Sequence, residues 1–209
     1  MLHTNTILLF LLATLTLNVT PGPDMLYVIA RSVGQGRSAG IVSALGISAG
    51  CCVHTLGVAF GLVSLMAAVP AAYEVIKYAG AAYLVYLGLR IVMSRPAPEA
   101  ETALKADSLS AIFLQGLLTN VLNPKVALFF LAFLPQFVDQ TAGSVAAQII
   151  FLGVLFNLSG TMVNVAVALA ASYTGARLKA YLKNSAVLRW VSGGLFIGLG
   201  IRLATLRRS

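Results

Sequence analysis

The residues Thr20-Pro21-Gly22-Pro23-Asp24, TPGPD, lie in a segment, residues 6–29, that is otherwise almost uncharged and mostly apolar. Proline lacks a backbone N–H, and its ring clashes with the preceding helical turn. A segment of this length is long enough to cross a bilayer as one helix, so the two prolines predict a break or kink inside the membrane. Asp24 adds a carboxylate at the same depth.

The whole chain has the composition of a membrane protein. Apolar residues make up 59% of its 209 residues, charged residues make up 10%, and the mean hydropathy is +0.91. The apolar content extends along the full chain, which excludes a single anchor on a soluble domain. The net charge of +8 comes mostly from Lys and Arg at the ends of apolar segments. These residues therefore indicate membrane topology and not nucleic-acid binding.

Six segments approach the 20 or so apolar residues that a transmembrane helix needs. They are residues 6–33, 39–66, 72–93, 110–137, 144–172 and 186–206. The polar stretch 94–108 separates a first three-helix unit, residues 1–93, from a second, residues 109–209, and we expect it to be a cytoplasmic linker. The distribution of Lys and Arg between the two sides favours both termini on the outer, periplasmic side.

The two units resemble each other in sequence. VIKYAGAAYLVYLGLRI at 75–91 aligns without gaps with VLRWVSGGLFIGLGIRL at 187–203, which pairs Gly88 with Gly200. With one residue of slippage, NVTPGPDMLYVIA from residue 18 also matches NVLNPKVALFFLA from residue 120. Because each unit has an odd number of spans, the second enters the membrane in the opposite sense. We predict an all-α membrane protein with two inverted three-helix repeats, helices 1 and 4 broken at mid-membrane, as in many secondary transporters.

The two break motifs predict a binding site. Thr20 and Asn123 can each cap a half-helix, with Pro21 and Pro124 at the favoured first position. The positive ends of both half-helices then meet at the bilayer midplane, where free N–H groups can bind a carboxylate. Proline kinks compensated by neighbouring helices are the alternative. The predicted substrate-binding residues are Thr20, Pro21, Gly22, Pro23, Asp24, Asn123, Pro124 and Lys125.

Asp24 is the only carboxylate predicted at mid-depth, and Lys125 is the only base. Each would cost about 2.5–3.5 kcal/mol at the centre of a helix, so we expect both to have a function. Lys125 beside a positive helix end opposes the helix dipole, which suggests that an anionic substrate group binds there. The alternative is a permanent Asp24–Lys125 ion pair that fastens the repeats together. A pair that opens for a zwitterion would satisfy both interpretations.

Further polar and small residues lie within the spans. His54, near the centre of the second span, either relays protons together with Asp24 or hydrogen-bonds to a neighbour. Asn157 and Asn164 fit interhelical hydrogen bonds better than ligands. The sequence has no metal-binding cluster, phosphate-binding loop or nucleophile elbow, so we expect neither an enzyme nor a cofactor. Gly-x-x-x-Gly pairs, which allow close helix approach within the chain or in a homo-oligomer, begin at Gly46, Gly57 and Gly194.

Four motifs carry a resemblance to a known family: TPGPDMLYVIARS at 20–32, GRSAGIVSALGISAG at 36–50, VIKYAGAAYLVYLGLR at 75–90 and GLLTNVLNPKVALFFLAFLPQF at 116–137. Through them the chain resembles, nearly end to end, the lysine exporter and homoserine/threonine exporter superfamily of bacterial amino-acid efflux proteins. Thr20 is a departure, because many members have Asn there. The resemblance implies proton-driven amino-acid export across the bacterial inner membrane, with motif positions at 21–24 and 123–125.

We therefore expect an exporter of a neutral or hydroxylated amino acid, such as homoserine or threonine, in exchange for a proton. Lys125 and the half-helix N–H groups would hold the carboxylate, and Asp24 would hold the ammonium group or the proton. The alternatives are export of another small solute or amino-acid metabolite, and a non-transporting membrane scaffold. A metal cation fits poorly, because the spans hold one carboxylate, one histidine and two adjacent cysteines.

Overall fold

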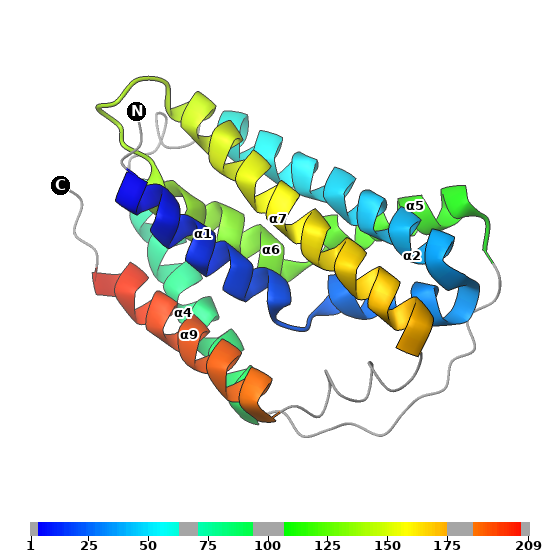
Figure 1. The fold of residues 1–209 in the computed structure, drawn as a ribbon. Helices are drawn as coiled ribbons and strands as arrows, with labels where there is room; N and C mark the ends of the chain where they lie inside the picture. The colour runs from blue at the N-terminus through cyan, green and yellow to red at the C-terminus, as the bar shows by residue number, and fades with distance from the viewer. Residues whose placement is uncertain (1–3, 63–70, 94–106, 175–185, 206–209) are drawn as a thin grey trace.

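The computed structural model describes residues 4–62, 71–93, 107–174 and 186–205, and every element in these ranges is a helix (Figure 1). In chain order the elements are α1 (Thr4–Val19), α2 (Pro23–Leu56), a π-helical segment (Gly57–Leu62), α4 (Ala71–Met93), α5 (Leu109–Val121), α6 (Pro124–Leu128), a second π-helical segment (Phe129–Phe133), a 3-10 helix (Leu134–Phe137), α7 (Val145–Thr174) and α9 (Ala186–Thr205). The predicted all-α class is confirmed for these ranges. Most of the predicted linker, residues 94–106, lies outside them.

The predicted break in the first apolar segment is present between α1 and α2. Gly22 is the N-cap of α2 and Pro23 begins it, where the fixed φ of proline suits the first helical turn. The prediction that Thr20 caps this helix, with Pro21 at its first position, is wrong. The Thr20 hydroxyl instead donates to the carbonyl of Thr16 at 2.6 Å, because threonine readily bonds the carbonyl four residues earlier. The second half-helix therefore starts two residues later than predicted.

The break in the fourth apolar segment lies between α5 and α6, where the helix axis bends by 46°. Here the predicted cap is confirmed: the side-chain oxygen of Asn123 accepts from the backbone N–H of Lys125 at 3.0 Å, and Pro124 occupies the first turn. Beyond α6 the helix continues as π-helical and 3-10 turns up to Phe137. Both breaks thus use proline at a helix start, but only the second uses a side-chain cap.

Gly36 divides α2 into two helices. Its φ of 82° and ψ of −174° are accessible only to glycine without strain, and α2 is kinked at this residue. By length and composition, residues 23–61 and α7 are each apolar and long enough to cross a membrane, and the bent pair of α5 and residues 124–137 is a third candidate span.

The outward face of the helices is apolar, as a lipid environment requires. On α1, Leu8, Leu12 and Leu15 are exposed, while Phe10 and Leu17 on the other side are buried. The buried side joins a core of phenylalanine rings that connects α1, the second π-helical segment and α7. Exposed leucine on one face and a packed aromatic core on the other are consistent with a helix at the lipid boundary.

Two groups of helices pack closely. α2 packs against α5 and α7, and α4 lies beside α9 (Figure 1). Glycine permits the close approach in both groups: a Cβ atom on Gly46 would lie 2.2 Å from the carbonyl oxygen of Phe113, and one on Gly88 would lie 2.6 Å from that of Gly193. Space around Gly57 and Gly194, which begin the other two predicted glycine pairs, is open.

Candidate functional site

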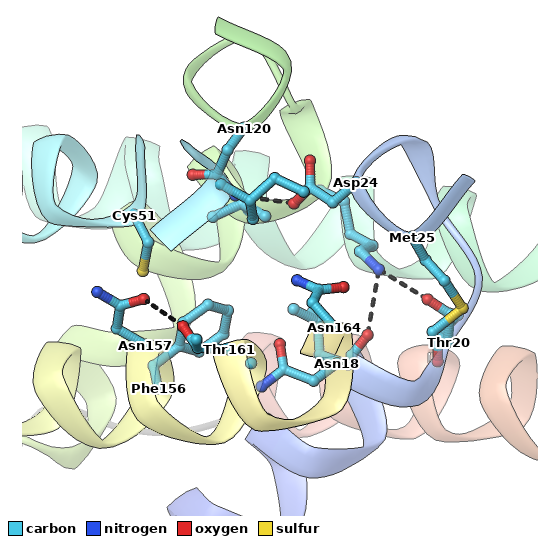
Figure 2. A pocket seen from close by; sticks show the side chains of 15 residues that line it. Asn18, Thr20, Asp24, Met25, Cys51, Asn120, Phe156, Asn157, Thr161 and Asn164 are labelled. Atoms are coloured by element: carbon cyan, nitrogen blue, oxygen red, sulfur yellow. Dashed lines mark hydrogen bonds between the residues drawn. The ribbon is translucent and has the colours of Figure 1, made fainter. Parts of the chain in front are cut away.

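A cavity that is partly open to solvent lies next to both helix breaks (Figure 2). Its walls come from α1, α2, α5, α6 and α7. Of the eight predicted binding residues, Thr20, Asp24 and Lys125 line this cavity. The other five, Pro21, Gly22, Pro23, Asn123 and Pro124, form the breaks beside it. The structure thus brings residues of the two sequence halves to one place.

The two carboxylate oxygens of Asp24 differ in their hydrogen bonds. Its Oδ2 accepts from the side-chain nitrogen of Asn120 at 2.8 Å. Its Oδ1 is buried and makes no hydrogen bond of ordinary length, and the same is true of the side-chain nitrogen of Asn123, which interacts with this carboxylate. The amide oxygen of Asn120 is also buried and unpartnered. Burying unpaired acceptors costs free energy, and a positively charged donor would relieve that cost. The negative charge of Asp24 in this wall of the cavity attracts a cation such as an ammonium group.

Lys125 reaches out of α6 to the end of α1. Its ammonium donates to the backbone carbonyl oxygens of Leu17 at 3.1 Å and Thr20 at 3.0 Å. The last carbonyls of a helix lack intrahelical partners and carry the negative end of its dipole. A cation is favoured there, so the carbonyls at the end of α1 offset the unfavourable position of Lys125 at the start of α6. An ammonium has three N–H donors, so one remains for a ligand.

Asp24 and Lys125 do not form the ion pair that was the alternative interpretation. Within the described ranges, the one Lys, Arg or His nitrogen within 4.0 Å of a carboxylate oxygen belongs to Arg31, which pairs with Asp107. Asp24 is held by Asn120 and Lys125 by α1. The two opposite charges therefore border one cavity, and each keeps part of its hydrogen-bonding capacity.

His54 lies outside the cavity lining. Its Nε2 is 3.0 Å from the backbone carbonyl oxygen of Asn120, and a carbonyl only accepts, so this nitrogen carries a hydrogen. The ring stacks on Phe130, with the ring centres 5.8 Å apart. Its connection to Asp24 runs through Asn120, which bonds His54 with its backbone and Asp24 with its side chain.

The cavity also contains residues that were not predicted as ligands. Asn18 and Asn120 both line it, and each lies in the last turn of a half-helix before a break. The sequence contains a feature that could have predicted them: each asparagine begins an Asn-Val pair at the same place in the two aligned break segments. The side-chain nitrogen of Asn157 donates to the carbonyl of Ser48 at 3.1 Å, an interhelical bond of the predicted kind.

A second polar cluster lies at the junction of α2 with the start of α5. The buried guanidinium of Arg31 is 2.6 Å from the carboxylate of Asp107 and also donates to the side-chain oxygens of Gln35 and Gln115. It lies 5.6 Å from the ring centre of Tyr27. Sequence reasoning treated Arg31 only as a topology signal, because its partners are distant in the chain. The cluster fastens α2 to α5.

We expect the Asp107→Asn variant to be less stable than the parent at neutral pH, with no change in that difference down to about pH 5. Hydrogen bonds from Arg31 and Gln115 lower the pKa of Asp107 below its usual value. A lowered folded-state pKa contributes stability above the unfolded pKa, about 3.9, and the contribution is lost as pH falls through the folded pKa. Melting curves of detergent-purified protein at several pH values measure this, and a difference that disappears between pH 7 and 5 would contradict it.

We predict that a side chain at position 22 would displace the ammonium group of Lys125. A Cβ atom on Gly22 would lie 3.0 Å from the Lys125 nitrogen and 3.3 Å from its Cε, so Gly22→Ala must displace the end of this flexible side chain. We expect a several-fold rise in substrate KM, because a hydrogen bond is worth about 1 kcal/mol, with little loss of stability. Gly34→Ala, where the added Cβ meets nothing within 4 Å, is the control. Equal KM values for both variants would contradict the prediction.

Apolar helices around a cavity that is lined by two opposite charges indicate a membrane transport protein. The family model described as LysE type translocator matches residues 15–207, and the chain belongs to this family. A leucine efflux protein of Salmonella choleraesuis is 29% identical over 95% of this chain and 94% of its own length. A homoserine/homoserine lactone efflux protein of Salmonella typhimurium is 28% identical over 96% of both chains. An uncharacterized membrane protein of Pseudomonas aeruginosa is 35% identical over 94% of this chain and 93% of its own length. No solved structure matches the chain.

Proposed function

We propose that this protein is a secondary exporter of amino acids in the bacterial inner membrane, driven by exchange for protons. The observation that carries the proposal is the pair of opposite charges, Asp24 and Lys125, that border one cavity without pairing to each other. The names of the two efflux proteins given above, which act on leucine and on homoserine or its lactone, support an amino-acid substrate.

The cavity is complementary to a zwitterion. The carboxylate of Asp24 is the acceptor for the substrate ammonium, and the remaining N–H of Lys125 is a donor for the substrate carboxylate. In this conformation neither charge has to leave an ion pair before the substrate binds. The start of α2 beside Asp24 adds the positive end of a helix dipole. Binding of an amino acid therefore satisfies groups that are otherwise incompletely paired.

Competition for Asp24 supplies a coupling mechanism. A proton and a substrate ammonium cannot both use the carboxylate of Asp24, so each ligand favours the conformations in which it binds better. The link from Asp24 through Asn120 to His54 makes His54 a second residue able to respond to that protonation. Release of the substrate on the outer side would then accompany proton uptake from that side.

Two contact patterns support six spans in two inverted repeats. The alignment that pairs Gly88 with Gly200 also pairs Ala81 with Gly193. A Cβ atom on Gly88 would lie 2.6 Å from the carbonyl oxygen of Gly193, and one on Gly200 would lie 2.8 Å from that of Ala81. Exchanging α4 and α9 thus converts one contact into the other, as a two-fold axis between repeats requires.

The second pattern lies at the cavity. Asn120, before the second break, packs against Gly50: a Cβ atom there would be 3.0 Å from the Asn120 amide oxygen. Asn18, before the first break, packs against Gly160, where the corresponding distance is 3.2 Å. Each asparagine comes from one half of the chain and its glycine from the other. The site is then formed at the repeat interface, where substrates bind in inverted-repeat transporters.

Purified protein in proteoliposomes tests the proposal directly. Vesicles loaded with a labelled amino acid, with an imposed pH gradient, should lose the label faster than vesicles without protein or without the gradient. A screen of neutral, hydroxylated and basic amino acids, their lactones and a divalent metal identifies the class of substrate. Loss of label that no pH gradient accelerates would contradict proton coupling, and no loss of any amino acid would contradict amino-acid export.

A further inference from the structure

Asn164 differs from every other asparagine of the cavity. It lies on α7, lines the cavity and is only 8% exposed. In the described part of the chain its carboxamide makes no hydrogen bond, whereas Asn18 bonds Ser159 at 3.1 Å and Asn157 bonds Ser48 at 3.1 Å. Figure 2 shows Asn164 directed into the space between α7 and the wall that carries Asp24. The amide atoms of Asn164 are not among the buried, unpartnered atoms of the structure, so they are accessible from the cavity and can bond a ligand there.

We infer that Asn164 is a specificity-determining residue that binds the side chain of the substrate and favours a hydroxyl group on it. This rests on the proposed function: with the amino and carboxylate groups held at Asp24 and Lys125, the α7 wall is left for the side chain. A carboxamide offers a donor and an acceptor, and a hydroxyl can match either one. Around it, Met25, Ile47 and Phe156 supply apolar contacts for the methylene groups.

The same arrangement disfavours an aliphatic side chain. A site built to bond a hydroxyl rejects the analogue that lacks it, because the polar group of the site is then left buried and unpaired. Asn164 therefore separates hydroxylated amino acids from aliphatic ones of the same size. Asn157 does not have this role, since its amide already joins α7 to α2 and accepts from Thr161 at 3.3 Å.

Isosteric substrate pairs test the inference. Homoserine and norvaline have nearly the same shape, as do threonine and valine, and they differ by a hydroxyl in place of a methyl group. In proteoliposomes the wild-type protein should export the hydroxylated member with a kcat/KM about tenfold or more above that of its partner, the factor for one unpaired polar group. The Asn164→Leu variant, close in volume, should reduce the ratio to about one while still exporting norvaline.

Met162→Leu is the matched control, because Met162 lies on α7 but is 74% exposed; its ratio should equal that of the wild type. Equal export of both members by the wild type, or an unchanged ratio in Asn164→Leu, would overturn the inference and leave the proposed function intact. Failure of the wild type to export any of the four amino acids would overturn the inference, and failure with every amino acid of the wider screen would overturn the proposed function as well. A ratio that falls only in Asn164→Leu supports the inference.

Discussion

Replacing Lys125 with methionine is expected to lower the kcat/KM for amino-acid export about 10- to 100-fold. A hydrogen bond to a charged group contributes about 1.5–3 kcal/mol, and each 1.4 kcal/mol is about a factor of ten. Methionine keeps much of the length of the side chain but loses the ammonium that binds Leu17 and Thr20 and, as we propose, the substrate carboxylate. The measurement is initial efflux from proteoliposomes across a range of substrate concentrations.

The Asp24→Asn variant should lose the coupling of export to the pH gradient. An amide replaces the carboxylate at almost constant volume, so the contact with Asn120 can persist, but the negative charge that attracts an ammonium is lost. We expect reduced export and, in the flux that remains, no acceleration by a pH gradient, because the variant has no carboxyl group at this position to protonate.

Selectivity for substrate analogues separates these roles from simple loss of structure. The Lys125→Met variant should no longer prefer an amino acid over its amide, in which an uncharged carboxamide replaces the carboxylate, because the group that recognises the carboxylate is gone. The Asp24→Asn variant should no longer prefer an amino acid over the corresponding hydroxy acid. If both variants kept both preferences of the wild type, the assignment of Asp24 and Lys125 to the two ends of the substrate would be wrong.

Gly46→Ala is expected to prevent normal folding, at a cost of about 3 kcal/mol or more. A Cβ atom at this position would lie 2.2 Å from the carbonyl oxygen of Phe113 and 3.0 Å from its carbonyl carbon. These are backbone atoms of α5, so they cannot move aside as a flexible side chain could. α2 and α5 would have to separate, and Asn120 and Asp24, which lie on these helices, would separate with them.

The measurement is the yield of monodisperse protein on size-exclusion chromatography, together with the melting temperature of what remains. Gly57→Ala and Gly198→Ala are matched controls, because an added Cβ at either site meets nothing within 4 Å. Since alanine favours helix by about 1 kcal/mol over glycine, both controls should be at least as stable as the parent. A Gly46→Ala protein as stable as the controls would contradict the close packing of α2 on α5.

The two helix breaks show which structural features can be predicted from neighbouring residues alone. Pro124 and Asn123 form a cap within three residues, and the structure has the predicted bond. At the first break, either Pro21 or Pro23 could begin the helix, with Thr20 or Gly22 before it as the cap. The prediction selected Thr20 and Pro21, whereas the structure has Gly22 and Pro23. The hydrogen bond from Thr20 back to Thr16 decided the outcome, together with Gly22 as the cap.

The sequence alone determined the features that depend on composition and on neighbouring residues: a helical membrane protein, two interrupted helices and two deep charges. Only the tertiary structure decided the partners of those charges. Asn120 is 96 residues from Asp24, and Leu17 is 108 residues from Lys125, and nothing within one helical turn selects among partners so far apart. Packing fixes them, because glycines such as Gly46 and Gly50 let the helices approach until these side chains meet at one cavity.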